Sequence, residues 1–215
     1  VIYNGIVRPI KLPSKEEIIR FKSDILKINN DVTTIGVVGR INKWKGQILL
    51  LDTFEKLSKN YPKVNLLIVG SPPAGQEIYL TQLQEQIKLK GLTDKVQIIP
   101  FQKNISKVWL CIDIAVVPSI LPEPFGLVAV EAMHLEIPVL ASNHGGLQEI
   151  ISDNTSGLFF EPNEGIDLYN KLELLISNSK LREKLAKNGR LSVSKRFTVE
   201  KYVSDFANLY LSLSK

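Results

Sequence analysis

Two carboxylates, Glu123 and Glu131, stand on either side of an expected helix start, with seven residues between them. Prolines flank Glu123, and Gly126 opens an apolar segment, Leu-Val-Ala-Val-Glu-Ala-Met, that predicts a helix. The first turn of a helix exposes unpaired amides at the positive end of its dipole, and these attract phosphate oxygens. Carboxylates repel a bare phosphate, so their useful partners are hydroxyl groups. Phosphate between two sets of hydroxyls describes a nucleotide-sugar.

The two carboxylates differ in how strongly their surroundings indicate a ligand. Glu131 interrupts a helix that is apolar almost all round. A buried carboxylate without a partner is costly, so Glu131 needs hydrogen-bond donors, which a ribose diol would supply. Glu123 lies between two prolines, where a simple turn residue is an equally good explanation. We therefore expect Glu131 to bind a ligand and leave both interpretations of Glu123 open.

A basic loop, Gly39-Arg-Ile-Asn-Lys-Trp-Lys-Gly46, follows one expected strand and precedes an expected helix. It lacks the glycine spacing of Walker and dinucleotide-binding loops. Arg40 can bind two phosphate oxygens at once and Lys45 adds a mobile charge, so together they could neutralise a diphosphate without a metal. A solvated surface loop is the alternative, and for this loop taken alone it is favoured. Lys43 and Trp44 are expected to be exposed or to pack.

A third segment, His144-Gly-Gly-Leu-Gln-Glu149, follows another expected strand. Its tandem glycines allow close backbone approach, which could serve a ligand, whereas Glu149 is better explained as a carboxylate that complements a helix dipole. His134 and His144 lack partners at metal-ligand spacing, and the chain has one cysteine, so we expect no metal site.

The composition narrows the classes of function. The chain has 215 residues, a net charge of +5 and 44% hydrophobic residues, which is ample for a packed core. The basic residues are scattered and not interleaved with aromatics, which disfavours nucleic acid and suits small anionic ligands or an acidic membrane surface. No apolar run is long enough to cross a bilayer, and no secretion signal is recognisable. Cys111 lies in an apolar run, which indicates core packing in a reducing, cytoplasmic compartment.

Short β-branched runs alternate with longer amphipathic segments through residues 31–178. The strands are apolar throughout, as in a sheet that is covered on both faces. We therefore expect an α/β fold with a doubly wound parallel sheet, Rossmann-like in its connections. The expected strands are 34–38, 64–69, 96–99, 114–117, 139–141 and 157–160, and the expected helices are 47–59, 76–90, 105–111, 126–135, 146–151 and 165–177.

Helical segments flank this core on both sides. Residues 14–27 predict a charged helix within an amino-terminal segment, 1–30. At the other end, residues 179–215 form a helical extension, in which we expect one helix over 181–189, closed by Gly189, and another over 198–213, capped by Thr198. One α/β domain with helical extensions accounts for the whole chain.

Ligands of an open parallel sheet bind beyond the carboxyl ends of its strands. Several candidate residues follow expected strands directly. The topology predicts that they converge on one rim with Glu123 and Glu131. These residues are Gly39 and Arg40, Gly70 and Ser71, Phe101, Pro118 and Ser119, and residues 142–146.

Together these residues resemble the carboxyl-terminal, nucleotide-sugar-binding half of retaining glycosyltransferases with the GT-B fold, in the glycosyl transferases group 1 family. A pair of glutamates at this spacing would alone be weak evidence, but the whole series of landmarks is specific. The resemblance covers nearly the whole chain, and the landmarks in the family's order are Asn4-Gly5, Gly39-Arg40 with Lys45-Gly46, Asp113, Pro118-Ser119, Glu123 to Glu131, Gly145-Gly146 with Glu149, and Gly157.

The resemblance implies a role for each matching position. Arg40 and Lys45 would hold the diphosphate and stabilise it as it leaves, with Gly39 in the same phosphate loop. Glu123 would face the sugar near the reacting carbon, and Glu131 would bind the ribose hydroxyls. The remaining expected contacts are the backbone amides of Gly126, Leu127 and Val128 with the diphosphate, Phe101 with the base, and Ser119 beside the donor.

The resemblance also implies a reaction and its partners. Family members retain the anomeric configuration and need no divalent metal, so no cofactor beyond a nucleoside diphosphate-sugar is expected. The chain would be the donor domain of a hexosyltransferase that uses UDP or GDP sugars. An acceptor-binding domain would precede it in the complete enzyme, and the piece alone would be inactive. The parent enzyme could attach peripherally to the inner face of the membrane.

Two positions depart from the family pattern. Val7 replaces a common aspartate after the Asn-Gly turn, and Pro100 replaces a common glycine before Phe101, which puts the turn's role and the shape of the base pocket in doubt. Two other functions stay open: a non-catalytic nucleotide-binding module, standing alone or partnered by a separate acceptor subunit, and a GT-B epimerase or phosphorylase.

Overall fold

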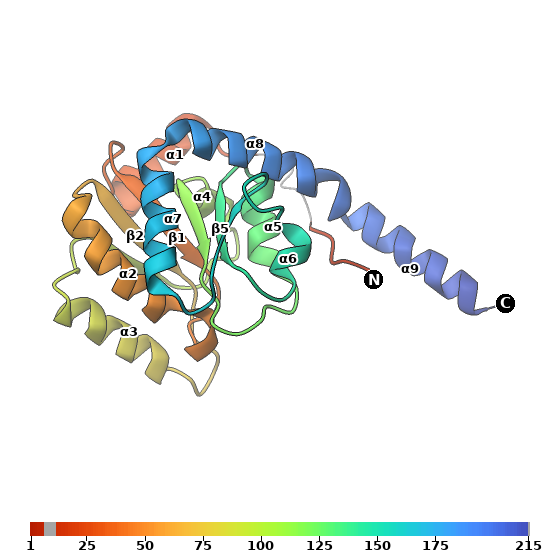
Figure 1. The fold of residues 1–215 in the computed structure, drawn as a ribbon, viewed down its shortest axis with the longest axis horizontal. Helices are drawn as coiled ribbons and strands as arrows, with labels where there is room; N and C mark the ends of the chain where they lie inside the picture. Colours follow the sequence, from red (N-terminus) through yellow and green to blue (C-terminus); the bar gives the residue numbers. More distant parts are fainter. Residues whose placement is uncertain (7–11, 215) are drawn as a thin grey trace.

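The structure is a computed structural model that describes residues 1–6 and 12–214. Figure 1 shows a central sheet with helices on both of its faces. Val7, where the sequence departs from the family pattern, lies outside the described residues. The six strands are β1 (Thr33–Val38), β2 (Val64–Val69), β3 (Val96–Ile99), β4 (Ile114–Val117), β5 (Val139–Ser142) and β6 (Leu158–Phe160).

All five strand pairings are parallel, and the spatial order is β3-β2-β1-β4-β5-β6. The chain first builds outward from β1 to β3, then returns to pair β4 with the other side of β1, with Ile35 opposite Ile114. This reversal of direction is the switch point of a doubly wound sheet. The predicted fold class is confirmed, and each expected strand is within one residue of its observed bounds.

Two apolar layers cover the sheet, because alternate strand residues point to opposite faces. On one face, Ile35, Leu66 and Val116 pack with helices α2 (Gln47–Asn60), α3 (Ile78–Leu89) and α7 (Gly165–Ser177). On the other face, Leu67 and Val117 pack with three helices near the rim, namely α4 (Ser106–Trp109), α5 (Leu127–His134) and α6 (Leu147–Ile150). Cys111 is buried in this second layer, as predicted, and burial raises the pKa of its thiol to about 11.

One helix boundary was predicted wrongly. Gly189 does not close a helix: α8 runs unbroken over Ser179–Arg196. A Cβ on Gly189 would lie 3.0 Å from the carbonyl oxygen of Ser156 and 3.4 Å from a side-chain carbon of Met133. The glycine therefore serves the close approach of α8 to α5 rather than a helix end, because any side chain would push these elements apart.

The amino-terminal segment folds as a short charged helix, as expected, which is α-helical at first and then π-helical. Ser14 and Glu17 form a capping box at the start of α1 (Lys15–Arg20), which continues as a π-helical segment, η1 (Phe21–Ile25). Before it, the amide of Ile6 donates to the carbonyl of Phe197 at 3.0 Å. The start of the chain thus lies against the junction between the last two helices.

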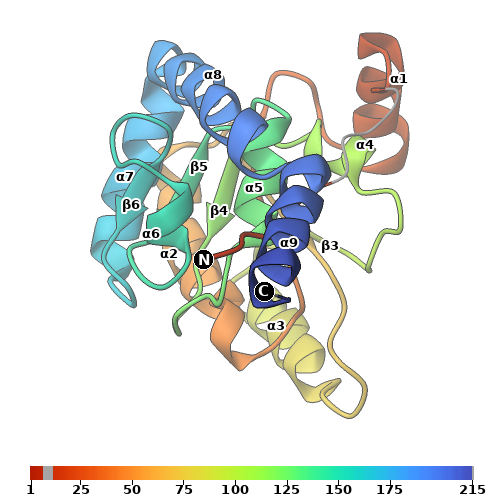
Figure 2. The same cartoon turned by 90° about the vertical axis from the view of Figure 1, so that its right-hand side faces the viewer.

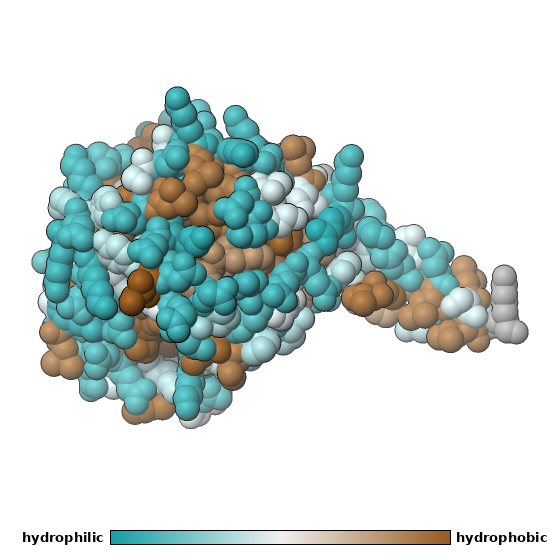
Figure 3. Space-filling model, in the orientation of Figure 1, coloured by the Kyte–Doolittle hydropathy of each residue, from teal (hydrophilic) through white to brown (hydrophobic). Residues whose placement is uncertain are grey.

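The last helix, α9 (Val199–Leu213), leaves the body of the molecule and projects into solvent (Figures 1 and 2). Thr198 caps it as predicted, by accepting a hydrogen bond from the amide of Lys201 at 3.1 Å. Tyr202, Phe206 and Tyr210 stack along one side, with ring centroids 4.8 and 6.3 Å apart, and no residue of α9 is buried. Brown apolar side chains are visible on this projecting part in Figure 3.

None of the helices in the described part of the chain is long and apolar enough to span a bilayer.

Candidate functional site

The candidate residues gather where the strands end, on both sides of the switch point. The loop after β1 carries Arg40 and a short 3-10 turn, η2 (Lys43–Lys45). The amide of Ile41 donates to the carbonyl of Ser71, and the amide of Ile120 donates to the carbonyl of Trp44 at 2.8 Å. The loop after β1 is therefore fixed by main-chain hydrogen bonds to the loops after β2 and β4, so these three loops form one rim.

A cavity of about 530 Å³ opens at this rim. It is lined by residues from the ends of β1, β2 and β3 and from the first two turns of α5. Half of the ten predicted site residues line it: Gly39, Arg40, Phe101, Val128 and Glu131. Ser71, which the sequence placed on this rim, forms part of the same wall together with Pro72 and Pro73, which the sequence did not single out.

Glu131 reaches this cavity from an otherwise apolar helix. Its neighbours Val130 and Ala132 are buried, while its own side chain is half-buried. One carboxylate oxygen, Oε2, accepts a hydrogen bond from the indole Nε1 of Trp109 at 3.2 Å. Burial raises the pKa of Glu131 above its ordinary value, and the Trp109 N–H offsets part of that rise. The sequence predicted that this carboxylate needs a donor, but not that Trp109 supplies it.

Phe101 forms the outer edge of the cavity. Its side chain is 74% exposed, and its backbone amide donates a hydrogen bond to the hydroxyl of Ser71 at 3.0 Å. An exposed ring fixed at a cavity mouth is a surface on which a planar base can stack. Pro100 lies between β3 and Phe101 and does not line the cavity.

Arg40 and Lys45 converge on Trp44. The guanidinium carbon of Arg40 lies 5.7 Å from the centroid of the indole ring, and Nζ of Lys45 lies 4.5 Å from it. Both distances are within the range of cation–π attraction. The ring of Trp44 therefore packs against both cations that were predicted to bind phosphate.

Lys45, Glu123 and Ser119 form a compact cluster beside the cavity. The Nζ of Lys45 forms an ion pair with Oε1 of Glu123, which also accepts a hydrogen bond from the hydroxyl of Ser119 at 2.5 Å. The side chains of Lys45 and Glu123 are only 13% and 5% exposed. Glu123 is therefore neither a free turn residue nor an open ligand contact, and its charge is balanced within the protein.

The tandem glycines after β5, Gly145 and Gly146, pack against the backbone of this cluster. The amide of Gly146 donates to the carbonyl of Glu123 at 2.7 Å, and His144 Nε2 lies 2.9 Å from the carbonyl oxygen of Ser119. Gly145 has a positive φ of 60°, and a Cβ there would lie 2.5 Å from the carbonyl oxygen of Glu123. The absence of side chains at these glycines thus allows the backbone of the Pro-Glu-Pro segment to pack against them. The sequence had suggested that the same loop could contact a ligand.

The start of α5 is shaped by a second glycine of positive φ. Gly126 has φ 104°, and a Cβ there would lie 2.7 Å from a side-chain carbon of Leu147, so it permits α5 to begin tight against α6. Of the three residues predicted to offer amides here, Val128 lines the cavity, whereas Gly126 and Leu127 do not. The side chain of Leu127 points away from the core and is exposed.

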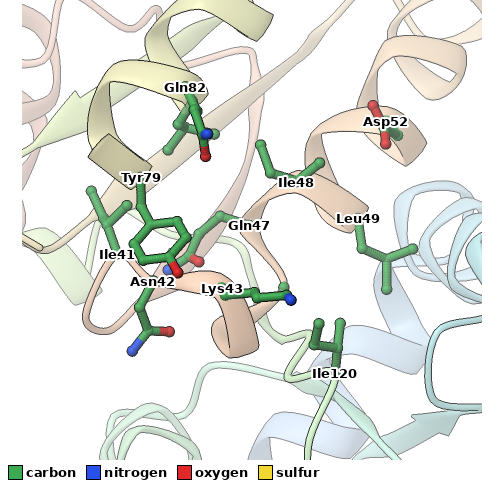
Figure 4. A pocket seen from close by; sticks show the side chains of 12 residues that line it. Ile41, Asn42, Lys43, Gln47, Ile48, Leu49, Asp52, Tyr79, Gln82 and Ile120 are labelled. Atoms are coloured by element: carbon green, nitrogen blue, oxygen red, sulfur yellow. The ribbon is translucent and has the colours of Figure 1, made fainter. Parts of the chain in front are cut away.

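A second cavity, of about 370 Å³, lies behind the same loop, between α2 and α3. Figure 4 shows the ring of Tyr79 beside Ile41 and Asn42, with Ile48, Leu49 and Ile120 completing a largely apolar wall. None of the ten predicted site residues lines it. Among the residues that the structure describes, no group of three or more His, Cys, Asp or Glu side chains could hold a metal ion in either place.

Comparison with known families gives a match over residues 18–192 to the model described as glycosyl transferases group 1. An uncharacterized glycosyltransferase of Methanocaldococcus jannaschii, MJ1607, is 31% identical over 98% of this chain and 53% of its own length. The capsular polysaccharide biosynthesis glycosyltransferase CapM of Staphylococcus aureus is 31% identical over 88% of this chain and 48% of its own. The chain spans about half the length of these curated relatives.

Solved structures show the same arrangement of helices and strands. Anabaena Alr3699/HepE, in a complex with UDP-glucose, superposes with a TM-score of 0.91 at 29% identity, covering 98% of this chain and 57% of that one. The carboxyl-terminal domain of the group 1 family protein LpcC from Francisella tularensis gives a TM-score of 0.78 at 30% identity, covering 91% of this chain and all of the other.

Proposed function

The chain belongs to the glycosyl transferases group 1 family, with the fold of a GT-B carboxyl-terminal domain, and from this premise we propose that it is the donor-binding half of a retaining glycosyltransferase. Its ligand in this proposal is a nucleoside diphosphate-sugar, from which the complete enzyme transfers a sugar to a hydroxyl acceptor. The observation that carries the proposal is the single cavity in which Arg40, Val128, Phe101 and Glu131 meet.

Each wall of this cavity suits one part of such a donor. Phe101 offers a stacking surface for the base, and Glu131 offers an acceptor for ribose hydroxyls. The first turn of α5 presents amides without helical acceptors beside Arg40, and amides and a guanidinium both bind diphosphate oxygens. The order base, ribose, diphosphate then follows the rim from the end of β3 to the end of β1.

Catalysis in this proposal is electrostatic. As the sugar departs, negative charge grows on the diphosphate, and the two cations on the Trp44 platform with the start of α5 stabilise that charge in place. No metal is required, because these groups already supply the positive charge. Lys45 must exchange its partner Glu123 for a phosphate oxygen, which frees Glu123 to accept hydrogen bonds from sugar hydroxyls.

Uridine diphosphate is the donor nucleotide that we propose for the first tests. The Anabaena structures similar to this chain carry UDP, UDP with glucose, or UDP-glucose, at 28–29% identity and TM-scores of 0.90–0.91. In the complete enzyme, an acceptor-binding domain would precede this half and close the cavity. The exposed aromatic side of α9 is the surface that we propose for its attachment.

The proposal is tested by the affinity of the protein for UDP, measured by calorimetry. Glu131→Ala and Lys45→Ala should each weaken binding at least tenfold, the loss of one charge-assisted contact. Lys43→Ala is the matched control, because Lys43 is an exposed cation of the same loop that faces the other cavity. Unchanged affinity in both test variants would falsify the assignment of this site.

A further inference from the structure

Trp109 contacts the site although no motif in the sequence places it there. It ends α4, a helix of one turn, and its side chain is 1% exposed within the apolar layer shared with α5. Its size and burial alone describe a core residue. Yet its one polar atom, Nε1, points at the carboxylate of Glu131.

Within residues 1–6 and 12–214, Glu131 has no cationic partner. Among the residues that the structure describes, the Trp109 N–H is the donor within hydrogen-bond distance of its carboxylate. Arg40 and Lys103 are the charged side chains that line the same cavity, and neither forms an ion pair with Glu131.

The geometry points to Trp109 as a positioning residue that aims the carboxylate of Glu131 at a vicinal diol in the cavity. Trp109 occupies Oε2, which leaves Oε1 for a ligand in the cavity. The indole is packed on all sides, so it has few ways to reorient. Its N–H is therefore a rigid and neutral donor that fixes the orientation of the carboxylate. This role rests on the proposed function, since it specifies how the ribose end of the donor is selected.

Phenylalanine at position 109 separates the two roles of this residue. Trp109→Phe keeps an aromatic ring in the core but removes the donor. The carboxylate of Glu131 is then buried without a hydrogen bond, so its pKa rises further and it is less often in the ionised form that binds a diol tightly. Val108→Ala is the control for packing, because Val108 is a buried neighbour on the same helix turn whose side chain has no polar atom.

The experiment compares the affinities for UDP and for 2′,3′-dideoxy-UDP, which lacks both ribose hydroxyls. In the wild type, UDP should bind more tightly. Trp109→Phe should reduce that preference about tenfold, with little effect on dideoxy-UDP, since the lost contact is to a charged group. Val108→Ala should preserve the preference. In a Glu131→Ala background, Trp109→Phe should have no further effect on it.

A pH series gives an independent reading. As the pH is lowered from 8, the preference for UDP should disappear at a higher pH in Trp109→Phe than in the wild type, because the carboxyl group protonates earlier. Dideoxy-UDP corrects for titration of the phosphates, which the two nucleotides share. A merely structural role for Trp109 would not shift this midpoint.

The outcomes separate the inference from the function on which it rests. Equal affinities of the wild type for the two nucleotides, or no binding of UDP, would overturn the proposed ribose contact before any variant is compared. A wild-type preference that survives Trp109→Phe, or that Val108→Ala reduces equally, would overturn the role of Trp109 alone.

Discussion

The two glutamates that flank the start of α5 have opposite surroundings. Glu123 is buried and shares one oxygen between an ammonium group and a hydroxyl. Glu131 is half-buried and faces a cavity, and its one donor in the described part of the chain is the neutral indole of Trp109. The first carboxylate is stabilised by the protein itself, whereas the second is left short of partners.

This difference shows how one motif can combine structure with binding. The Lys45–Glu123 pair links the loop after β1 to the loop after β4, so it holds the rim together before a ligand arrives. Glu131 contributes little to the stability of the fold. The free-energy cost of its partial burial can be lowered by a ligand whose hydroxyl groups donate hydrogen bonds to it.

Removal of the Lys45 side chain should destabilise the fold most. Lys45→Ala leaves the Glu123 carboxylate charged and buried without its cation, at a cost of about 3 kcal/mol in the free energy of unfolding. Lys45→Ala combined with Glu123→Gln should recover most of that loss, since no buried charge is left unpaired. Chemical denaturation of the two variants measures both effects. A single variant as stable as the wild type would show that the pair does not hold the rim.

A methyl group at Gly145 should disturb the backbone of Glu123 directly. Gly145→Ala combines a positive φ with a contact of 2.5 Å to the carbonyl oxygen of Glu123, and we expect a loss of about 2 kcal/mol. Gly91→Ala is the matched control, because Gly91 has a φ of 65° and open space around the position of the added Cβ. The difference between the two melting curves isolates the contact. Equal losses would mean that backbone strain alone explains the effect.

Glu131 should make the stability of the protein depend on pH in the direction opposite to a paired carboxylate. Its pKa in the folded state is raised above the ordinary 4.5, so the folded protein holds a proton that the unfolded chain releases. Stability should therefore fall as the pH rises from 4.5 through the raised value.

The comparison protein for this effect is Glu131→Gln, which cannot ionise. Denaturant titrations between pH 4 and pH 8 should show the wild type losing stability relative to this variant as the pH increases. A gain of relative stability over the same range would mean that the folded protein stabilises the ionised carboxylate, and the contrast with Glu123 would disappear.

The sequence was sufficient for the sheet because its signals there are local. Six apolar runs bounded by polar turns define the strands, and their alternation with amphipathic segments requires parallel connections. The error at Gly189 arose where a distant contact, the approach of α8 to Met133 and Ser156, overrode the usual meaning of a glycine. Such a contact is invisible in a single helix.

The site was foreseen in its residue types but not in its pairings. Strand ends and helix starts indicated Arg40 and Glu131 correctly as residues of one cavity. The pairing of Lys45 with Glu123 and the donation by Trp109 depend on side chains that only the folded chain brings together. Among the family landmarks, Asp113 lies before β4 and accepts from the amide of Thr34 at 2.7 Å, so it fastens two strands at the end away from the rim.

The hydrogen bond between Thr34 and Asp113 joins residues 79 positions apart in the chain. One edge of β1 therefore stays unpaired until β4 has been synthesised. A nascent chain that has left the ribosome only as far as β3 has one unpaired edge of β1 exposed and no rim across the switch point. If the chain binds a nucleotide as proposed, that nucleotide has no complete site during the early stages of folding. It can stabilise the native state only after the segment through Glu131 has emerged, because Val128 and Glu131 line the cavity.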